Sequence, residues 1–390
     1  LEYDSFGSVE KNYSTIRLSN HKEKKEKFRN DAKNYHYGNN NKLIKGIGFG
    51  NYQELYVSKY SPFIDITYDY NYFINHKDII LSNITKSENV KEVRINQETI
   101  YKENMIYAMR GSDAETVYNN RTKTGDGVVV GILESGIVKT NDSLLSDVDI
   151  TIRPSIHNLL GKSDHTTGMA QLIAGSTGVA PGVSLLSAYL SGTLNDEIDW
   201  MLDNGVDIIN MSFGETSGDG TYSTVSAYAD YIAYTYDVIL VASAGNRGES
   251  DGYIGNPGLG YNVITVGSGD YSGSIHEFSS YVTLVGPIKP TVSVHGTGIE
   301  ISPDLEEVGG TSVSAALCSG LIALLLEDYP GLVAEKEKLI ALIVANAKDS
   351  IYYRYNRDNG FDRDVGAGLF SYQNILDHYN TVFTYTNSTG

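Results

Sequence analysis

The chain has 390 residues, 41% of them hydrophobic, so it is long enough to bury the core of one large domain and of a smaller one. Its 48 acidic residues outnumber its 30 basic ones, and the resulting formal charge of −18 excludes nucleic acid and anionic membrane surfaces as expected partners. A single cysteine, Cys318, excludes an internal disulfide and a cysteine metal cluster. No run of about 18 uninterrupted apolar residues occurs, so we expect no membrane span.

The first 40 residues are predicted to form a polar arm. They contain a charge run, Lys22 to Lys27, which we interpret as a solvated helix or a flexible segment rather than a binding patch. The chain begins with Leu1 and not with methionine, so we expect that an N-terminal segment has been removed and that any signal peptide lies outside the sequence.

Residues 41–110 are predicted to form a small α/β unit. Apolar and polar residues alternate in three short runs, as in half-buried strands, and a helical pattern lies between the second and third runs. The strands are expected at 55–57, 63–68 and 93–95, and the helix at 79–87. Residues 102–123 are a polar linker without a sustained period, and we assign the second domain to residues 111–390.

From residue 125 onward, apolar strands alternate with helices, which predicts a doubly wound, mostly parallel α/β sheet. The run 128–133 is continuously apolar, as in a strand that is covered on both faces. Further strands are expected at 183–190, 206–211, 238–243, 263–267 and 281–285, and helices at 166–176, 195–204, 221–236 and 333–347. In such sheets, functional side chains gather at the carboxyl ends of the strands.

A glycine turn at 309–310 leads into a helix, residues 315–326, that is apolar on nearly every face and therefore predicted to be buried all round. Ser312 lies at the start of this helix, where unpaired backbone N–H groups and the positive end of the helix dipole favour developing negative charge. On its own, a serine at such a place is more often the N-cap of a core helix.

Three other polar residues lie where the sheet would place a site. Glu134 directly follows a strand, His165 opens a helix, and Asn246 follows another strand. A carboxylate, an imidazole and a hydroxyl are the groups required for acyl transfer by an activated serine, and an amide can donate to an oxyanion. Taken singly, Glu134 is more readily explained as a helix cap, His165 as a structural histidine and Asn246 as a turn residue.

In their order and local context, these residues resemble those of the subtilisin-like serine proteases, in which acid, histidine and serine follow one another along the chain. The most specific match is Gly310-Thr311-Ser312 with its small-residue helix. Further matches extend the resemblance over about residues 123–369, and they lie at 177–181, 206–214, 242–248, 255–257 and 263–267. The family carries a cis peptide bond at the matching turn, so Pro257 is expected to follow one.

The resemblance implies a serine endopeptidase and a role for each matched residue. Ser312 would attack the peptide carbonyl, and His165 would take its proton and pass it to the leaving amine. Glu134 would orient the imidazole, and Asn246 would donate to the oxyanion. The residues expected to bind an extended protein or peptide substrate are Ser212, Phe213, Gly214, Ser243, Ala244 and Gly245.

Four positions depart from the family's pattern. Glu134 replaces an aspartate, which keeps the charge but adds one methylene between the strand and the imidazole. Thr166 replaces a glycine, Gly168 a second histidine and Ala316 a proline, and Thr166 is expected to crowd a place where the backbone is normally bare. Two hypotheses follow: a divergent, active endopeptidase, or a pseudoprotease that binds a peptide or partner at the same site without turnover.

The resemblance also gives the N-terminal unit a role. Family members are made as zymogens with a prodomain of similar size, which templates folding and then plugs the substrate cleft. Residues 90–98 are similar to the last strand and exit of that prodomain. An unrelated accessory domain is the alternative.

Location and cofactors follow from the family alone. The resemblance implies a protein that is secreted or held at the cell surface. Calcium binds structurally in many family members, but no matching loop is identifiable here, and we interpret Asp358, Asp362 and Asp364 as a solvated loop without EF-hand spacing. No other cofactor is expected.

Overall fold

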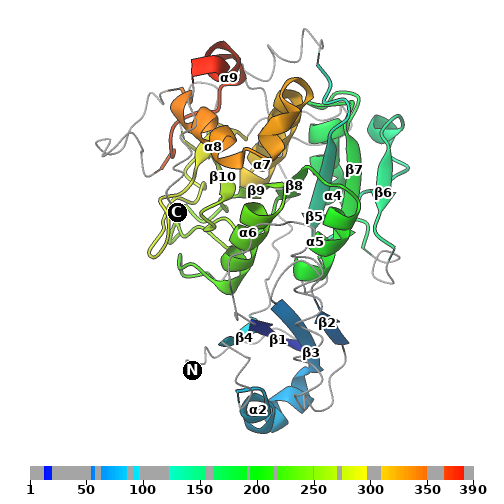
Figure 1. The fold of residues 1–390 in the computed structure, drawn as a ribbon, viewed down its shortest axis with the longest axis vertical. Helices are drawn as coiled ribbons and strands as arrows, with labels where there is room; N and C mark the ends of the chain where they lie inside the picture. Colours follow the sequence, from blue (N-terminus) through cyan, green and yellow to red (C-terminus); the bar gives the residue numbers. More distant parts are fainter. Residues whose placement is uncertain are drawn as a thin grey trace, which may run out of the picture. The chain divides into compact units, whose positions relative to one another are not determined.

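The computed structural model describes residues 13–19, 54–57, 63–85, 92–96, 123–154, 161–190, 194–214, 218–248, 250–269, 275–296, 309–348 and 364–381. The chain divides into two compact units (Figure 1). The smaller unit comprises Leu1–Thr99 together with Gly192–Trp200, and the larger unit comprises Ile100–Ser191 and Met201–Gly390.

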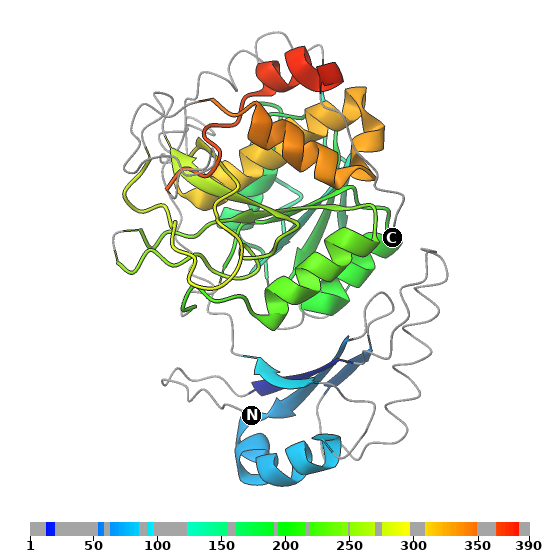
Figure 2. The ribbon, with the colours of Figure 1, turned by 60° about the vertical axis from the view of Figure 1, so that its left-hand side comes forward.

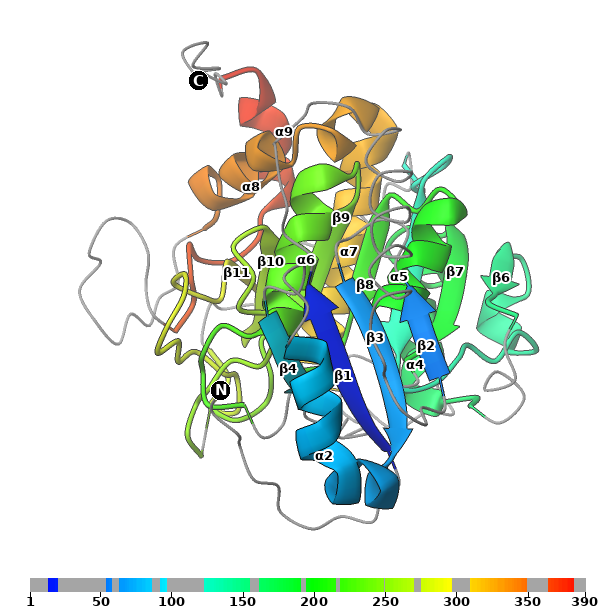
Figure 3. The ribbon, with the colours of Figure 1, turned by 60° about the horizontal axis from the view of Figure 1, so that its bottom comes forward.

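In the described part of the chain, the smaller unit contains an antiparallel sheet of four strands in the order β2-β3-β1-β4, which helix α2 accompanies (Figure 3). The strands are β1 (Tyr13–Ser19), β2 (Glu54–Val57), β3 (Phe63–Asp69) and β4 (Glu92–Asn96). Helix α2 (Tyr70–Thr85) contacts β1, β3 and β4. Its Ile80 and Ile84, four residues apart and so on one face, are buried, as is Ile66 of β3.

Strand β1 falls within the segment predicted as a polar arm, and here the structure differs from that expectation. Ile16 lies opposite Ile66 of β3 and Ile95 of β4, so the strand pairs on both edges. Only Ile16 and Leu18 carry the apolar alternation, which is too short to indicate a strand among polar neighbours. The charge run Lys22 to Lys27 and residues 102–122 lie outside the described residues, and the predicted domain boundaries stay predictions.

The larger unit is built on a sheet of seven strands in the order β11-β10-β9-β8-β5-β7-β6, with every neighbouring pair parallel. The predicted doubly wound parallel sheet is confirmed. Its strands are β5 (Val129–Glu134), β6 (Ile150–Ile152), β7 (Ser184–Tyr189), β8 (Ile208–Met211), β9 (Ile239–Ser243), β10 (Val263–Gly269) and β11 (Val292–His295).

Helices cover both faces of this sheet (Figure 2). On one face α4 (Asp164–Ala174) contacts α7 (Thr311–Asp328), and α7 contacts β8, β9, β10 and β11. On the other face α6 (Thr224–Thr235) contacts β9 and β10. The remaining α-helices of the described chain are α5 (Leu194–Asp203), α8 (Lys336–Ala345) and α9 (Tyr372–His378).

One predicted strand is wrong. Residues 281–285 form only isolated bridges, and Leu284 and Val285 are exposed. The strand that pairs with β10 is instead β11, whose Ser293 is fully buried and donates from its hydroxyl to the carbonyl of Val365 at 3.2 Å. A satisfied serine inside a four-residue strand leaves little apolar pattern to detect. The Asn256–Pro257 peptide bond is cis, as expected.

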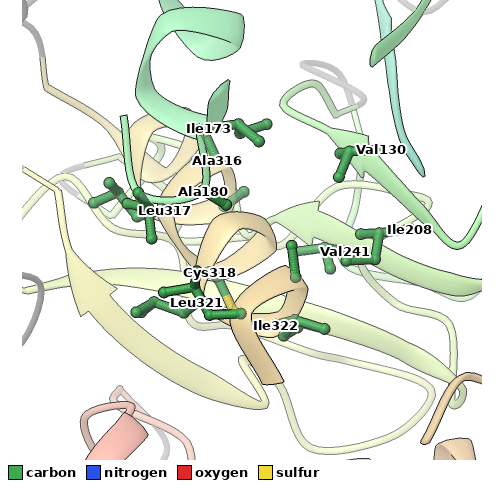
Figure 4. Close-up of a cluster of buried hydrophobic side chains, with 14 of the residues drawn as sticks. Val130, Ile173, Ala180, Ile208, Val241, Ala316, Leu317, Cys318, Leu321 and Ile322 are labelled. Atoms are coloured by element: carbon green, nitrogen blue, oxygen red, sulfur yellow. The ribbon is translucent and has the colours of Figure 1, made fainter. Parts of the chain in front are cut away.

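Helix α7 runs through the core of the larger unit. Its Ala316, Leu317 and Ile322 pack in one cluster with Ile173 of α4 and with strand residues such as Val130, Ile208 and Val241 (Figure 4). By length and composition this helix alone among the described residues could cross a membrane, but 83% of its apolar window is buried inside the protein, as in a core helix. Ser312 therefore starts from a helix whose depth is fixed by apolar packing.

The far end of α7 is tied to the first described residues of the larger unit. Oε2 of Glu327 accepts backbone N–H groups from Thr124 at 2.8 Å, Gly125 at 2.7 Å and Asp126 at 3.3 Å. The ammonium of Lys123 pairs with Asp328. A carboxylate at a helix C-terminus is unfavourable toward the helix dipole, and these donors offset that cost.

A buried lysine lies in the segment of the chain that connects β10 to β11. Lys289 is 3% exposed, and its ammonium donates to the carbonyl of Val263 at 2.5 Å and to Oγ1 of Thr291 at 3.2 Å. Burial lowers the pKa of Lys289 to about 7, although the charge of Asp230 acts in the opposite direction. Between pH 7 and 10.5 the unfolded chain therefore holds a proton at this lysine that the folded chain releases.

We predict that Lys289→Met removes a pH dependence of stability. Because the unfolded state binds more protons at Lys289, the free energy of unfolding rises as the pH increases from 7 to 10.5. Below pH 7 both states hold the proton, and the folded state carries the full cost of a buried charge. Lys289→Met should therefore raise the melting temperature most at pH 6 and least at pH 10, measured by circular dichroism.

The exposed Lys162 offers a matched control, since Lys162→Met removes a charge without changing a buried site. A melting temperature of Lys289→Met that stays parallel to that of the wild type from pH 6 to 10 would contradict the prediction.

Candidate active site

Two neighbouring strand ends place the first residues of the site. Glu134 is the last residue of β5, and Ser212 directly follows β8, which pairs with β5. The strand order reverses at β5, because the chain first adds β7 and β6 on one side of it and then returns to add β8 on the other. The carboxyl ends of strands at such a reversal are where ligands bind in open parallel sheets.

The first turn of α4 brings the imidazole to Glu134. Ser163 is the N-cap, with its hydroxyl accepting the N–H of Thr166 at 3.3 Å, so His165 lies in the first helical turn. Nδ1 of His165 is 2.5 Å from Oε2 of Glu134, and these side chains are 12% and 2% exposed. A carboxylate oxygen accepts hydrogen bonds, so in this contact Nδ1 is the donor and Oε2 of Glu134 the acceptor.

Thr166 takes part in the same contact. Its side chain is fully buried, and its hydroxyl lies 3.5 Å from the Oε2 of Glu134 that also receives His165. The other oxygen of Glu134, Oε1, is buried and accepts no hydrogen bond from the described residues. The threonine expected to crowd the backbone thus lies beside the carboxylate, with its hydroxyl directed to the carboxylate's paired oxygen.

Ser312 lies in the first turn of α7, which begins at Thr311 after Gly310. Gly310 has φ 134°, a conformation that glycine adopts readily, and a Cβ there would lie 3.1 Å from Nδ2 of Asn246. The hydroxyl of Ser312 donates to the backbone carbonyl of Ser212 at 3.1 Å. In return the hydroxyl of Ser212 donates to the carbonyl of Ser312 at 3.0 Å.

Asn246 is held by the residue before the serine. Thr311 donates to Oδ1 of Asn246 from its backbone N–H at 3.0 Å and from its hydroxyl at 2.9 Å. A backbone N–H can only donate, so the atom that faces it is the amide oxygen, and Nδ2 remains as the donor of an exposed side chain. Gly245 donates its own N–H to the Thr311 hydroxyl at 3.0 Å, which completes the link between the end of β9 and the start of α7.

The residues predicted to bind substrate lie on two neighbouring segments. Residues 212–214 follow β8 and residues 243–245 end or follow β9, and the two strands pair. The hydroxyl of Ser243 donates to the carbonyl of Phe213 at 3.3 Å, which joins the segments. A Cβ at Gly214 would lie 3.7 Å from Cα of Gly255, so this stretch runs close to the loop before the cis proline.

Comparison with known proteins settles the family. Residues 125–368, more than half of the chain, match the family model described as the subtilase family. The chain belongs to the subtilase family. The resemblance found in the sequence is confirmed, and the subtilases are serine peptidases.

Individual proteins that are similar to this subtilase are also subtilisin-like proteases. Subtilisin DY of Bacillus licheniformis is 33% identical over 252 residues, which cover 59% of this chain and 88% of the relative. The thermostable alkaline protease of Halalkalibacterium halodurans is 27% identical over 263 residues, covering 64% of this chain and 70% of the relative. Fervidolysin of Fervidobacterium pennivorans shares the fold with a TM-score of 0.63 at 19% identity, over 96% of this chain and 62% of that one.

The described residues of this subtilase contain no group of three or more His, Cys, Asp and Glu side chains that could hold a metal ion. Asp358 and Asp362 lie outside the described residues. Asp364 is 5% exposed, so its interpretation as part of a solvated loop is wrong. The described part of the chain therefore contains no cluster of carboxylates for the calcium ion that the resemblance implies.

Sequence reasoning gave no role to two residues that the site uses. Thr311 fixes the amide of Asn246, and its position next to Ser312 was the signal available. Asn210 is fully buried in β8 and donates from Nδ2 to the hydroxyl of Ser212 at 2.9 Å. A lone amide inside the apolar run 206–211 was the signal there, because buried polar groups are seldom without a partner.

Proposed function

We propose that this subtilase is a serine endopeptidase that cleaves peptide bonds through an acyl-enzyme. The observation that carries the proposal is the buried hydrogen bond between Nδ1 of His165 and Oε2 of Glu134, at the sheet edge where Ser312 begins its helix. This bond fixes the tautomer of the ring and leaves Nε2 to act as the base.

In this mechanism Glu134 orients His165 and stabilises the imidazolium that forms when the ring takes a proton. The extra methylene of glutamate is accommodated, because its carboxylate reaches Nδ1 within hydrogen-bonding distance from the last residue of β5. Burial of the pair excludes water and strengthens their interaction.

Ser312 acts as the nucleophile. In the structure its hydroxyl donates to the carbonyl of Ser212. For proton transfer the hydroxyl hydrogen turns toward Nε2 of His165. The oxygen of Ser312 then bonds to the substrate carbonyl carbon, and the imidazolium returns the proton to the leaving amine. Water hydrolyses the acyl-enzyme by the same steps in reverse.

Asn246 donates from Nδ2 to the oxyanion, and the fixed acceptor contacts of its Oδ1 pre-organise that donor. Backbone groups of residues 212–214 and 243–245 pair with an extended substrate as an added strand. The substrate is a protein or peptide, and we place the enzyme outside the cell or at its surface.

A pseudoprotease is the second candidate function. The observation that favours it is the hydrogen bond by which Ser312 donates to the backbone of Ser212 rather than to an activating base. In that case the same strand ends bind a peptide or partner without turnover.

Covalent labelling separates the two functions. We predict that a fluorophosphonate probe labels Ser312 in the wild-type protein, and that Ser312→Ala abolishes the label. The matched control is Ser314→Ala, which removes a fully buried hydroxyl from the same helix and should keep the label. Mass spectrometry identifies the modified residue. Folded wild-type protein that takes no label would favour the pseudoprotease.

The role of Glu134 is tested by two substitutions. Glu134→Gln keeps the shape and removes the charge, and we predict a fall in kcat approaching about 10⁴-fold because the ring loses its tautomer and its counter-charge. Glu134→Asp keeps the charge but withdraws it by about one bond length, so we predict a smaller loss, about 10²-fold or less. Rates of peptide hydrolysis that match the wild type in both variants would exclude the orienting role.

We further propose that the N-terminal part of the smaller unit, Leu1–Thr99, is a prodomain removed by self-cleavage. One support is that the residues form a compact unit with its own antiparallel sheet. The other is that residues 123–126, which follow the linker, are held by Glu327 and Asp328. A cut after Lys102 and before Lys123 would leave this anchored start of the larger unit intact.

Intact mass spectrometry checks the processing. The purified full chain should convert into two fragments whose new ends lie between residues 102 and 123, and the Ser312→Ala variant should remain whole. If both proteins stay whole while the wild type still takes the fluorophosphonate label, the unit is an accessory domain rather than a prodomain.

A further inference from the structure

A chain of buried polar side chains links the interior of α7 to the backbone of Ser312. Its members are Asn210 and Ser319, both fully buried, and Ser212, which is 5% exposed. Burying such groups is costly unless they are hydrogen-bonded, and here each one is. We call these three residues the polar relay.

The contacts of the polar relay run in one direction. The hydroxyl of Ser319 lies 3.1 Å from Oδ1 of Asn210 and 2.9 Å from the carbonyl of Ala315, so its hydrogen is shared by two acceptors. Nδ2 of Asn210 donates to the hydroxyl of Ser212 at 2.9 Å. That hydroxyl donates in turn to the carbonyl of Ser312 at 3.0 Å.

The relay supplies a directional restraint that apolar packing of α7 does not give. The helix is apolar on nearly all sides, and apolar packing is non-directional, so it sets the depth of the helix more strongly than its rotation. Its N-cap, Gly310, makes no side-chain capping hydrogen bond. Hydrogen bonds have strict geometry, and those of the relay tie α7 to β8 at both its first and its third turn.

We propose that Ser319, through Asn210 and Ser212, is a positioning residue for the nucleophile Ser312. The proposal rests on the proposed endopeptidase function. Catalysis is steeply sensitive to the placement of reacting atoms, since an error of about 1 Å can cost about 10²-fold in rate. A relay that holds the carbonyl of Ser312 also limits the rotation of the first turn from which its hydroxyl projects.

The test compares two serines of α7. Ser319→Ala breaks the relay, whereas Ser314→Ala removes an equally buried hydroxyl that donates to Val294 of β11 instead. Both should lower the melting temperature by a similar amount, because each removes one buried hydrogen-bonding hydroxyl. Only Ser319→Ala should lower kcat and the rate of fluorophosphonate labelling, by about 10-fold, with KM unchanged. Equal rates in the two folded variants would overturn the proposal.

A double-mutant cycle asks whether Ser319 acts through Ser212. If it does, Ser212→Ala with Ser319→Ala should react no more slowly than Ser212→Ala alone, because the relay is already broken. Additive losses would overturn the relay as the route. Should Ser319→Ala fail to fold, Ser319→Cys keeps a similar volume with a weaker donor, and its labelling rate should lie below that of the wild type.

Failure of the proposed function gives a different result. A folded wild type that takes no fluorophosphonate label would exclude both the endopeptidase and a catalytic positioning role for Ser319. A wild type that is labelled at the same rate as Ser319→Ala excludes only the positioning role.

Discussion

The adjacency of β5 and β8 is the constraint on which the rest of the site depends. These strands pair in parallel, with Val130 opposite Ile208, and so bring Glu134 and Ser212 to the same edge of the sheet. Helices α4 and α7, which contact each other on one face, then add His165 and Ser312 to that edge. The structure thus joins His165 to Glu134 and Ser312 to Ser212 by hydrogen bonds at the ends of two paired strands.

The resemblance to the family predicts an aspartate at position 134, and the structure shows how the longer glutamate meets His165. The carboxylate still reaches Nδ1 of His165 and is almost fully buried, so charge and contact are both kept. Thr166, where the resemblance predicts a glycine, lies beside the same oxygen. Two positions that the resemblance marks as departures, 134 and 166, are thus neighbours in space.

The sequence predicted most strands of the sheet because they are largely apolar runs. Of the residues that it singled out, Glu134 ends β5, His165 and Ser312 lie in the first turns of α4 and α7, and Asn246 follows β9. It failed at β11, where the buried Ser293 is satisfied by Val365, a residue 72 positions away. It also gave no role to Ser319, whose partner Asn210 is 109 positions away. In both cases the missing information is a long-range hydrogen bond, which apolar periodicity does not record.

Two kinds of interaction, apolar packing and hydrogen bonding, therefore determine the position of Ser312. Apolar burial packs α7 against the sheet. Gly320 lets the loop between α4 and β7 pack close to the helix, since a Cβ there would lie 2.7 Å from Cβ of Val179. Thr311 and the polar relay then restrain the orientation of the helix start, one through Asn246 and the other through Ser212. A helix held only by the first kind would bring a serine to the site without fixing where its hydroxyl points.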